Sequence, residues 1–197
     1  MLIPMDAAQP QQLKAYGVVF RSLKTGGRGE WLLNYRAGSF LLERDARTER
    51  DAALNGVSAE LVSDSDVLDI RGQIASSNME QIPLEKAPKV AVYVSPTSSP
   101  WDDAVRIALQ YADIEHDKLW DAEVLGGKLK DYEWLHLHHE DFTGQYSKFY
   151  LTYSGAPWLA EAVQRNTQMA RQWGFPNVAE LKKAVARRIR GYVENGG

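Results

Sequence analysis

The side chains best suited to chemistry in this sequence are three histidines and two acids that stand close together. Imidazole and carboxylate groups bind transition metals such as zinc, and they also transfer protons near neutral pH. Histidines this close on a strand can share one metal ion, and a third ligand nearby leaves one position open for water. One interpretation is a divalent metal held by His138, His139 and Asp141. The full cluster is His136, His138, His139, Glu140 and Asp141.

The same cluster has two other interpretations, and the sequence leaves all three open. The histidines and acids can form a general acid/base pair. Alternatively they serve the structure or orient a ligand: His136 is then a satisfied core histidine, His138 and His139 form hydrogen bonds around a strand end, and the two acids cap a turn.

A short buried strand is expected to position the cluster, because apolar residues and histidine interleave over residues 134–137. Side chains alternate across a strand, so His136 and His138 share one face and His139 lies on the other. In open α/β sheets, ligands bind beyond the carboxyl ends of the strands. Residues 138–141 are therefore predicted to stand at the mouth of a site.

Two loops supply further candidates for ligand binding. Ser95 opens a loop between the strand predicted at Lys89–Val94 and a helix that Ser99 is predicted to cap, where backbone N–H groups can face an anion. This loop has no glycine, so the backbone cannot approach a phosphate as closely as a glycine-rich loop does. Asn34 and Arg36 lie in a turn between two apolar strands, which fits either a polar ligand site or an ordinary hairpin loop.

The bulk composition excludes several classes of function. The 197 residues are 44% hydrophobic and 25% charged, which is typical of a globular chain with a buried core. A net charge of -3 gives no electrostatic footprint for nucleic acid, and no apolar run is long enough for membrane insertion. With no cysteine, disulfides and a cysteine nucleophile are excluded. We expect a soluble protein, cytoplasmic by default, with an exported full-length form left open.

Strands and helices alternate along the chain, which predicts an α/β protein with a mostly parallel sheet and right-handed crossovers. Residues 76–88 are polar and contain two prolines, so they are interpreted as a linker. The predicted organisation is a small α/β unit over residues 1–86, followed by residues 88–197.

Two groups of side chains are predicted to have ordinary structural roles. The basic face of the last helix (Lys182, Lys183, Arg187, Arg188 and Arg190) is expected in solvent, and Trp101, Trp158 and Trp173 are expected in the core.

Several long segments resemble a known family. The strand Lys89–Val94, the histidine strand, the long helix and the ending Tyr192–Gly197 are similar to the first half of a class I glutamine amidotransferase-like domain, which is a flavodoxin-like α/β fold. More closely, LIPMDAAQPQQLKAYG, WLLNYRAGSF and WLHLHHEDFTGQYSKFY resemble bacterial proteins labelled asparagine synthetase B-like. The resemblance implies that residues 88–197 are the N-terminal portion of such a domain.

The catalytic residues of these families have no counterpart here. The amidotransferase nucleophile is a cysteine on the strand after the last helix, and this sequence stops at Gly197 without any cysteine. Asparagine synthetase B has a cysteine at its mature N-terminus and an S-G-G-x-D-S loop, whereas position 2 is Leu2 and no such loop occurs. We therefore expect a catalytically incomplete piece of a larger protein, with a partner in the chain beyond Gly197. It would act as a scaffold or small-ligand-binding module; the alternative is a metal-dependent hydrolase that uses residues 138–141.

Overall fold

The computed structural model describes residues 1–137, 142 and 153–197. The chain forms two compact units. The first contains residues 1–87 and 103–115, and the second contains residues 88–102 and 116–197. Residues 103–115 thus pack with the first unit, although the sequence placed them in the second. In the described part of the chain, no helix has both the length and the apolar character needed to cross a membrane.

The first unit is built on a four-stranded sheet in which every neighbouring pair is antiparallel. Its two faces carry separate buried clusters, because side chains alternate along each strand. Ile3 and Phe40 face one way and pack with α1 and α2, while Leu2 and Leu41 face the other way and pack with α3. The strands, in the order in which they pair, are β1 (Leu2–Ile3), β3 (Ser39–Leu42), β2 (Gly29–Leu33) and β4 (Glu80–Leu84).

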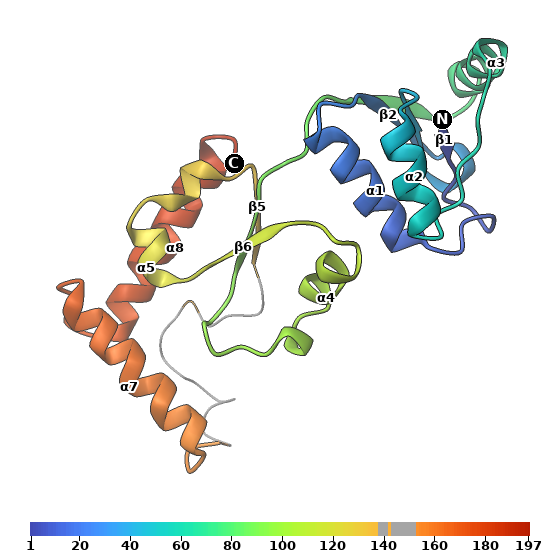
Figure 1. Cartoon of the computed structure of the whole chain (residues 1–197). Helices are drawn as coiled ribbons and strands as arrows, with labels where there is room; N and C mark the ends of the chain where they lie inside the picture. Colours follow the sequence, from blue (N-terminus) through green and yellow to red (C-terminus); the bar gives the residue numbers. More distant parts are fainter. Residues whose placement is uncertain (138–141, 143–152) are drawn as a thin grey trace. The chain divides into compact units, whose positions relative to one another are not determined.

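Helices α2 and α3 of the first unit begin where the sequence supplies a side-chain cap. Ser63 and Asp66 form a capping box at the start of α3, as a serine followed three residues later by an acid favours. Asp45 caps α2 in a similar way through the backbone N–H of Thr48. α1 and α2 lie side by side (Figure 1). The helices are α1 (Gln12–Lys24), α2 (Ala46–Leu54), α3 (Asp64–Ala75) and α4 (Ala104–Tyr111), with a 3-10 turn η1 (Tyr35–Ala37) between β2 and β3.

The second unit contains a small parallel sheet with β5 in the centre. β5 is fully buried, as its continuous apolar character predicts. Tyr93 and Ala91 point toward α8 and α5, which lie side by side (Figure 1). The strands are β6 (His116–Leu119), β5 (Val90–Tyr93) and β7 (Trp134–Leu137). The helices are α5 (Asp121–Leu125), α7 (Pro157–Gln172) and α8 (Val178–Glu194), with 3-10 turns η2 (Pro100–Asp102) and η3 (Lys128–Asp131).

Several sequence predictions are corrected by this fold. The parallel sheet is confined to the second unit, because the first unit joins its strands by a hairpin and by helices that return them antiparallel. The predicted linker contains β4, an exposed edge strand where a proline is tolerated. β7 is also an edge strand and is only partly buried. The three tryptophans expected in the core are exposed, and Trp101 retains 76% of its accessible surface.

Candidate functional site

A buried charged cluster lies at the carboxyl ends of β5 and β6. Tyr93 ends β5, Asp121 begins α5 just after β6, and Lys182 reaches in from α8. The Tyr93 hydroxyl donates to Asp121 Oδ1 at 2.5 Å. The Lys182 ammonium donates to the same oxygen at 3.0 Å and to the Tyr93 hydroxyl at 3.1 Å. The ammonium is also 2.9 Å from Asp121 Oδ2; this contact is an ion pair, but its geometry is not that of a hydrogen bond.

Aromatic rings complete the surroundings of the Lys182 ammonium. The ammonium sits over the ring of Trp120, 3.9 Å from its centroid, in a cation–π contact. The Tyr93 ring stacks between Trp120 and Phe142, with centroid distances of 4.8 and 5.1 Å. Lys182 is 3% exposed, whereas Asp121 and Tyr93 are wholly buried. A ligand cannot reach these polar groups, so the cluster positions the strand ends and α8.

Lys182 is a residue that the sequence analysis placed wrongly, in the solvated basic face of the last helix. The helix turns it inward instead, together with Val178, Val185 and Ile189. The signal was present, because positions 178, 182, 185 and 189 follow helical spacing on one face. A lysine on that stripe signals a buried partner, since charged groups are buried only when they are paired.

A polar group of residues lies at the same edge of the sheet, in the loop that follows β5. The Ser95 and Thr97 hydroxyls are 3.2 Å apart. Arg165 on α7 donates from Nη2 to the Thr97 hydroxyl at 3.3 Å. Its Nε is buried without a hydrogen bond, and no carboxylate of the described residues pairs with this guanidinium. Arg165 therefore keeps donors and a positive charge available near the carboxyl end of β5.

The cap predicted for the helix after this loop is wrong, while a ligand role for Ser95 stays a prediction. A carboxylate oxygen of Asp102 accepts the backbone N–H of Ser99 at 3.0 Å. The following helix starts later than expected, at Ala104, and its cap is Asp103 rather than Ser99. Positive character at this edge therefore comes from Arg165, which the sequence analysis did not single out. The sequence gives no signal for this role, since Glu161 lies four residues earlier on the same helix and an i,i+4 pair would be the ordinary expectation.

The histidine cluster is described only in part. His136 lies in β7 opposite Val92 of β5, and it is half-buried. His138, His139, Glu140 and Asp141 lie outside the described residues, so the metal site remains a prediction. Within the described residues, no group of three or more histidine and acidic side chains is placed to hold a metal ion.

Asn34 and Arg36 belong to the first unit, whereas Ser95 and His136 belong to the second. Arg36 pairs with Asp6 at 2.7 Å and with both carboxylate oxygens of Glu60 at 2.9 Å. This guanidinium lowers the pKa of the Asp6 carboxyl, and the hydrogen bond that Arg36 donates to Asp6 raises the pKa of Arg36 in return. Asn34 donates to the carbonyl of Asn78 at 3.4 Å. These contacts hold the turn between β2 and β3; a ligand role for the two residues stays a prediction.

A pocket of about 590 Å³ lies at the opposite, amino-terminal edge of the parallel sheet. Tyr132 and Tyr192 line it, and Arg187 and Arg188 give it a basic rim. Burial and a hydrogen bond to Asp117 raise the pKa of Tyr132 to about 12, so its hydroxyl is a proton donor at neutral pH. The pocket offers N–H and O–H donors, the carboxylate of Glu133 and apolar surface.

No protein family model, curated protein or solved structure matches this chain. The molecule is an α/β protein with an antiparallel four-stranded sheet and a small three-stranded parallel sheet. Its function must therefore be inferred from the chemistry of its own residues.

Proposed function

We propose that this chain is a small-ligand-binding α/β module without turnover of its own. Its second unit would be a portion of a flavodoxin-like, class I glutamine amidotransferase-like sheet, related to the proteins labelled asparagine synthetase B-like. Two features support this fold: parallel strands flank β5 on both sides, and helices α5 and α8 pack on one face. The sequence contains no cysteine that could serve as the amidotransferase nucleophile.

The observation that carries the proposal is the guanidinium of Arg165 beside Thr97, beyond the end of β5. Ligands of open parallel sheets bind at this edge. An arginine that pairs with no carboxylate of the described residues is suited to a carboxylate or phosphate, which its planar N–H groups can bind in bidentate fashion. The buried cluster of Tyr93, Asp121 and Lys182 beneath the loop keeps the strand ends fixed, which lowers the entropic cost of binding. The proposed ligand is a small anion.

Titration calorimetry with succinate and with inorganic phosphate tests this proposal, supported by amide NMR shifts at Thr97 and Ser98. Arg165→Met should weaken binding by roughly 10- to 100-fold, because a hydrogen bond to a charged group is worth about 1.5–3 kcal/mol. Arg171→Met on the same helix, where no side-chain partner is described, is the matched control and should bind as the unaltered chain does. Equal binding by Arg165→Met, or no binding of either anion, would contradict the proposal.

A separate assay tests the absence of turnover. The chain should release no ammonia from glutamine and form no asparagine from aspartate. Turnover that persists through repeated purification would replace the binding module with an enzyme.

The metal-dependent hydrolase remains the alternative, because its residues lie outside the described part of the chain. Metal content measured by mass spectrometry, on protein purified without a nickel column, decides between the two functions. About one zinc, iron or manganese per chain, lost in His138→Ala, would favour the hydrolase. A chain without metal after reconstitution would exclude it.

A further inference from the structure

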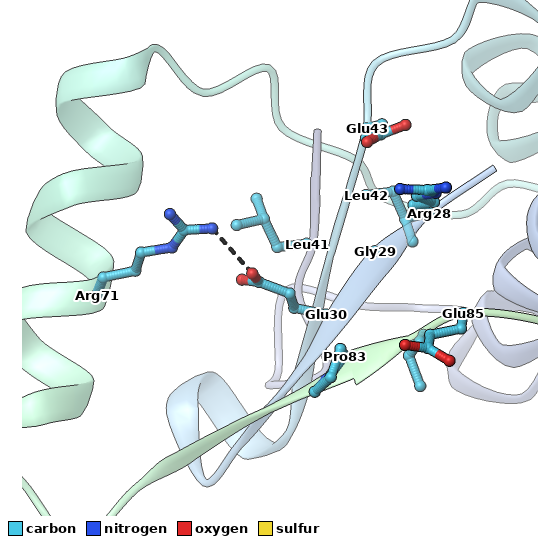
Figure 2. Close-up of a pocket in the computed structure, with 10 residues that line it drawn as sticks. Arg28, Gly29, Glu30, Leu41, Leu42, Glu43, Arg71, Pro83 and Glu85 are labelled. Atoms are coloured by element: carbon cyan, nitrogen blue, oxygen red, sulfur yellow. Dashed lines mark hydrogen bonds and ion pairs between the residues drawn. The ribbon is translucent and has the colours of Figure 1, made fainter.

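The first unit contains a pocket of about 600 Å³ at one end of its antiparallel sheet (Figure 2). Strand register explains which side chains line it. Glu30 of β2 lies opposite Leu41 of β3 and Pro83 of β4. Leu41 faces α3, and its register partners on the neighbouring strands share that face. The apolar surface of Leu41 and Pro83 therefore lies beside the carboxylate of Glu30.

A second row of charged residues lies two positions further along the same face. Arg28 precedes β2, and its carbonyl accepts the backbone N–H of Glu43 at 3.0 Å, which continues the ladder beyond the strands. Glu85 occupies the equivalent position after β4. Figure 2 shows Arg71 reaching from α3 toward Glu30, with Arg28, Glu43 and Glu85 on the side away from that helix. The pocket thus has two guanidinium groups and three carboxylates around a small apolar surface.

Only one oxygen of the Glu30 carboxylate accepts a hydrogen bond from a described residue. Its Oε1 accepts from Arg71 Nη2 at 2.8 Å. Its Oε2 is buried and receives no hydrogen bond from any described residue, although the side chain as a whole is 25% exposed to the pocket. A carboxylate oxygen without a donor is unfavourable, and because the Glu30 side chain is partly exposed, a turn of its carboxylate would offer this oxygen to an N–H group in the pocket. Arg71 uses one of its five N–H donors on Glu30 and can give others to a ligand.

We propose that this pocket binds a small zwitterionic α-amino acid. Its ammonium group donates to Glu30 Oε2, its carboxylate accepts from Arg71, and its side chain lies against Leu41 and Pro83. A zwitterion matches the mixture of charges better than a simple anion, which three carboxylates would repel, or a simple cation, which would meet two guanidinium groups. A divalent metal is disfavoured, since the described acids do not gather as a ligand set. This site is independent of the one proposed in the second unit.

Amide NMR titration of the whole chain with L-alanine tests the proposal. Saturable shifts are expected at Gly29, Glu30 and Leu41, and not at Thr97, which reports on the other unit. Glycine betaine has the same two charges but no N–H donor, so it should bind at least 10-fold more weakly. Acetate and methylammonium each carry one charge and should also bind weakly. Equal binding of betaine, acetate or methylammonium would overturn the zwitterion site.

Matched variants assign the contacts. Glu30→Gln should weaken L-alanine binding at least 10-fold, while Glu80→Gln at the far end of β4 should leave it unchanged. Arg71→Met should also weaken it, and Arg50→Met on α2 should not; retained amide dispersion shows that each variant is folded. If Glu30→Gln and Arg71→Met both bind as the unaltered chain does, or if no shift at these amides saturates, the pocket holds only water and the proposal fails.

Discussion

The two units attach their peripheral helices by opposite means. In the second unit, a buried ion pair between Lys182 and Asp121 ties α8 to the end of the parallel sheet. In the first, the segment of residues 103–115 rests against α1 backbone to backbone. A Cβ at Gly17 would lie 1.7 Å from the Ala112 oxygen, and Arg21 donates to that same oxygen at 3.0 Å. The attachment of α8 depends on pairing a buried charge, whereas that of residues 103–115 depends on the absence of a side chain at Gly17. Different substitutions should therefore destabilise the two units.

The largest expected effect is that of Lys182→Met on the second unit. The substitution leaves Asp121 buried without its cation, which typically costs about 3–5 kcal/mol. Urea denaturation followed by amide NMR intensities resolves the two units, and the loss should appear at β5 and α8. An equal loss in both units would show that the ion pair does not act locally.

A double variant separates a lost charge partner from lost packing. Lys182→Met with Asp121→Asn removes both charges and keeps an amide oxygen to accept the Tyr93 hydroxyl. It should recover much of the stability, because removing a buried pair together is far less costly than breaking it. If the double variant is no more stable than Lys182→Met alone, packing of the lysine stem dominates instead.

Gly17→Ala should destabilise the first unit by about 1–3 kcal/mol, the usual cost of overpacking, since α1 and the backbone of Ala112 must move apart. The matched control is Gly72→Ala on α3, where a Cβ would meet nothing within 4 Å. That change should stabilise the same unit by about 0.5–1 kcal/mol through helix propensity. Similar effects of the two substitutions would mean that α1 and residues 103–115 are not in close contact.

Local signals predicted local structure well in this chain. The apolar run at residues 39–42 is typical of a strand and forms β3, and the spacing of Ser63 and Asp66 is typical of a capping pair and caps α3. Helical spacing of Leu13, Tyr16, Gly17, Phe20 and Leu23 predicts the inner face of α1, and this prediction is only partly right. Gly17 and Leu23 are buried, whereas Leu13 and Tyr16 are exposed. The reason is tertiary, because the backbone of Ala112 approaches α1 closely at Gly17 and so centres the buried face on that glycine.

The candidate site was harder to predict than the elements. Strand periodicity does not specify whether neighbours run parallel or antiparallel, so the antiparallel first sheet could not be foreseen from its strands. Ser95 was identified because it lies in a loop after a buried strand, which is a local pattern. Its companion Arg165 comes from a helix 70 residues away in sequence, and only the fold brings that guanidinium to Thr97. Glu30 and Arg71 meet for the same reason.

A smaller, pH-dependent effect is expected from Arg36→Met in the first unit. The hydrogen bond from Arg36 lowers the pKa of Asp6 below its ordinary value near 3.8. A carboxyl whose pKa is lowered in the folded state stabilises the fold at pH values above its unfolded-state pKa. This stabilisation is lost as the pH falls through the folded-state pKa. Arg36→Met should therefore lower the free energy of unfolding at pH 7, with a loss several-fold smaller than that of Lys182→Met. The difference from the unaltered chain should shrink below pH 3.8. Arg44→Met, which breaks the more exposed pair with Glu49, is the control and should change little.

The smallest effect is a gain, expected from Ala37→Gly in the turn that Arg36 holds. Ala37 has φ of 64° and is exposed, so the substitution removes little packing. A left-handed conformation costs an L-residue about 1–2 kcal/mol, whereas the added freedom of glycine in the unfolded chain costs about 0.5–1 kcal/mol, which leaves a net gain of about 0.5–1 kcal/mol. Urea denaturation of the first unit measures this gain, with the exposed Ala53→Gly in α2 as a control that should lose stability. A loss in both variants would mean that residue 37 is not left-handed, and that the ion pairs of Arg36 hold a relaxed turn rather than a strained one.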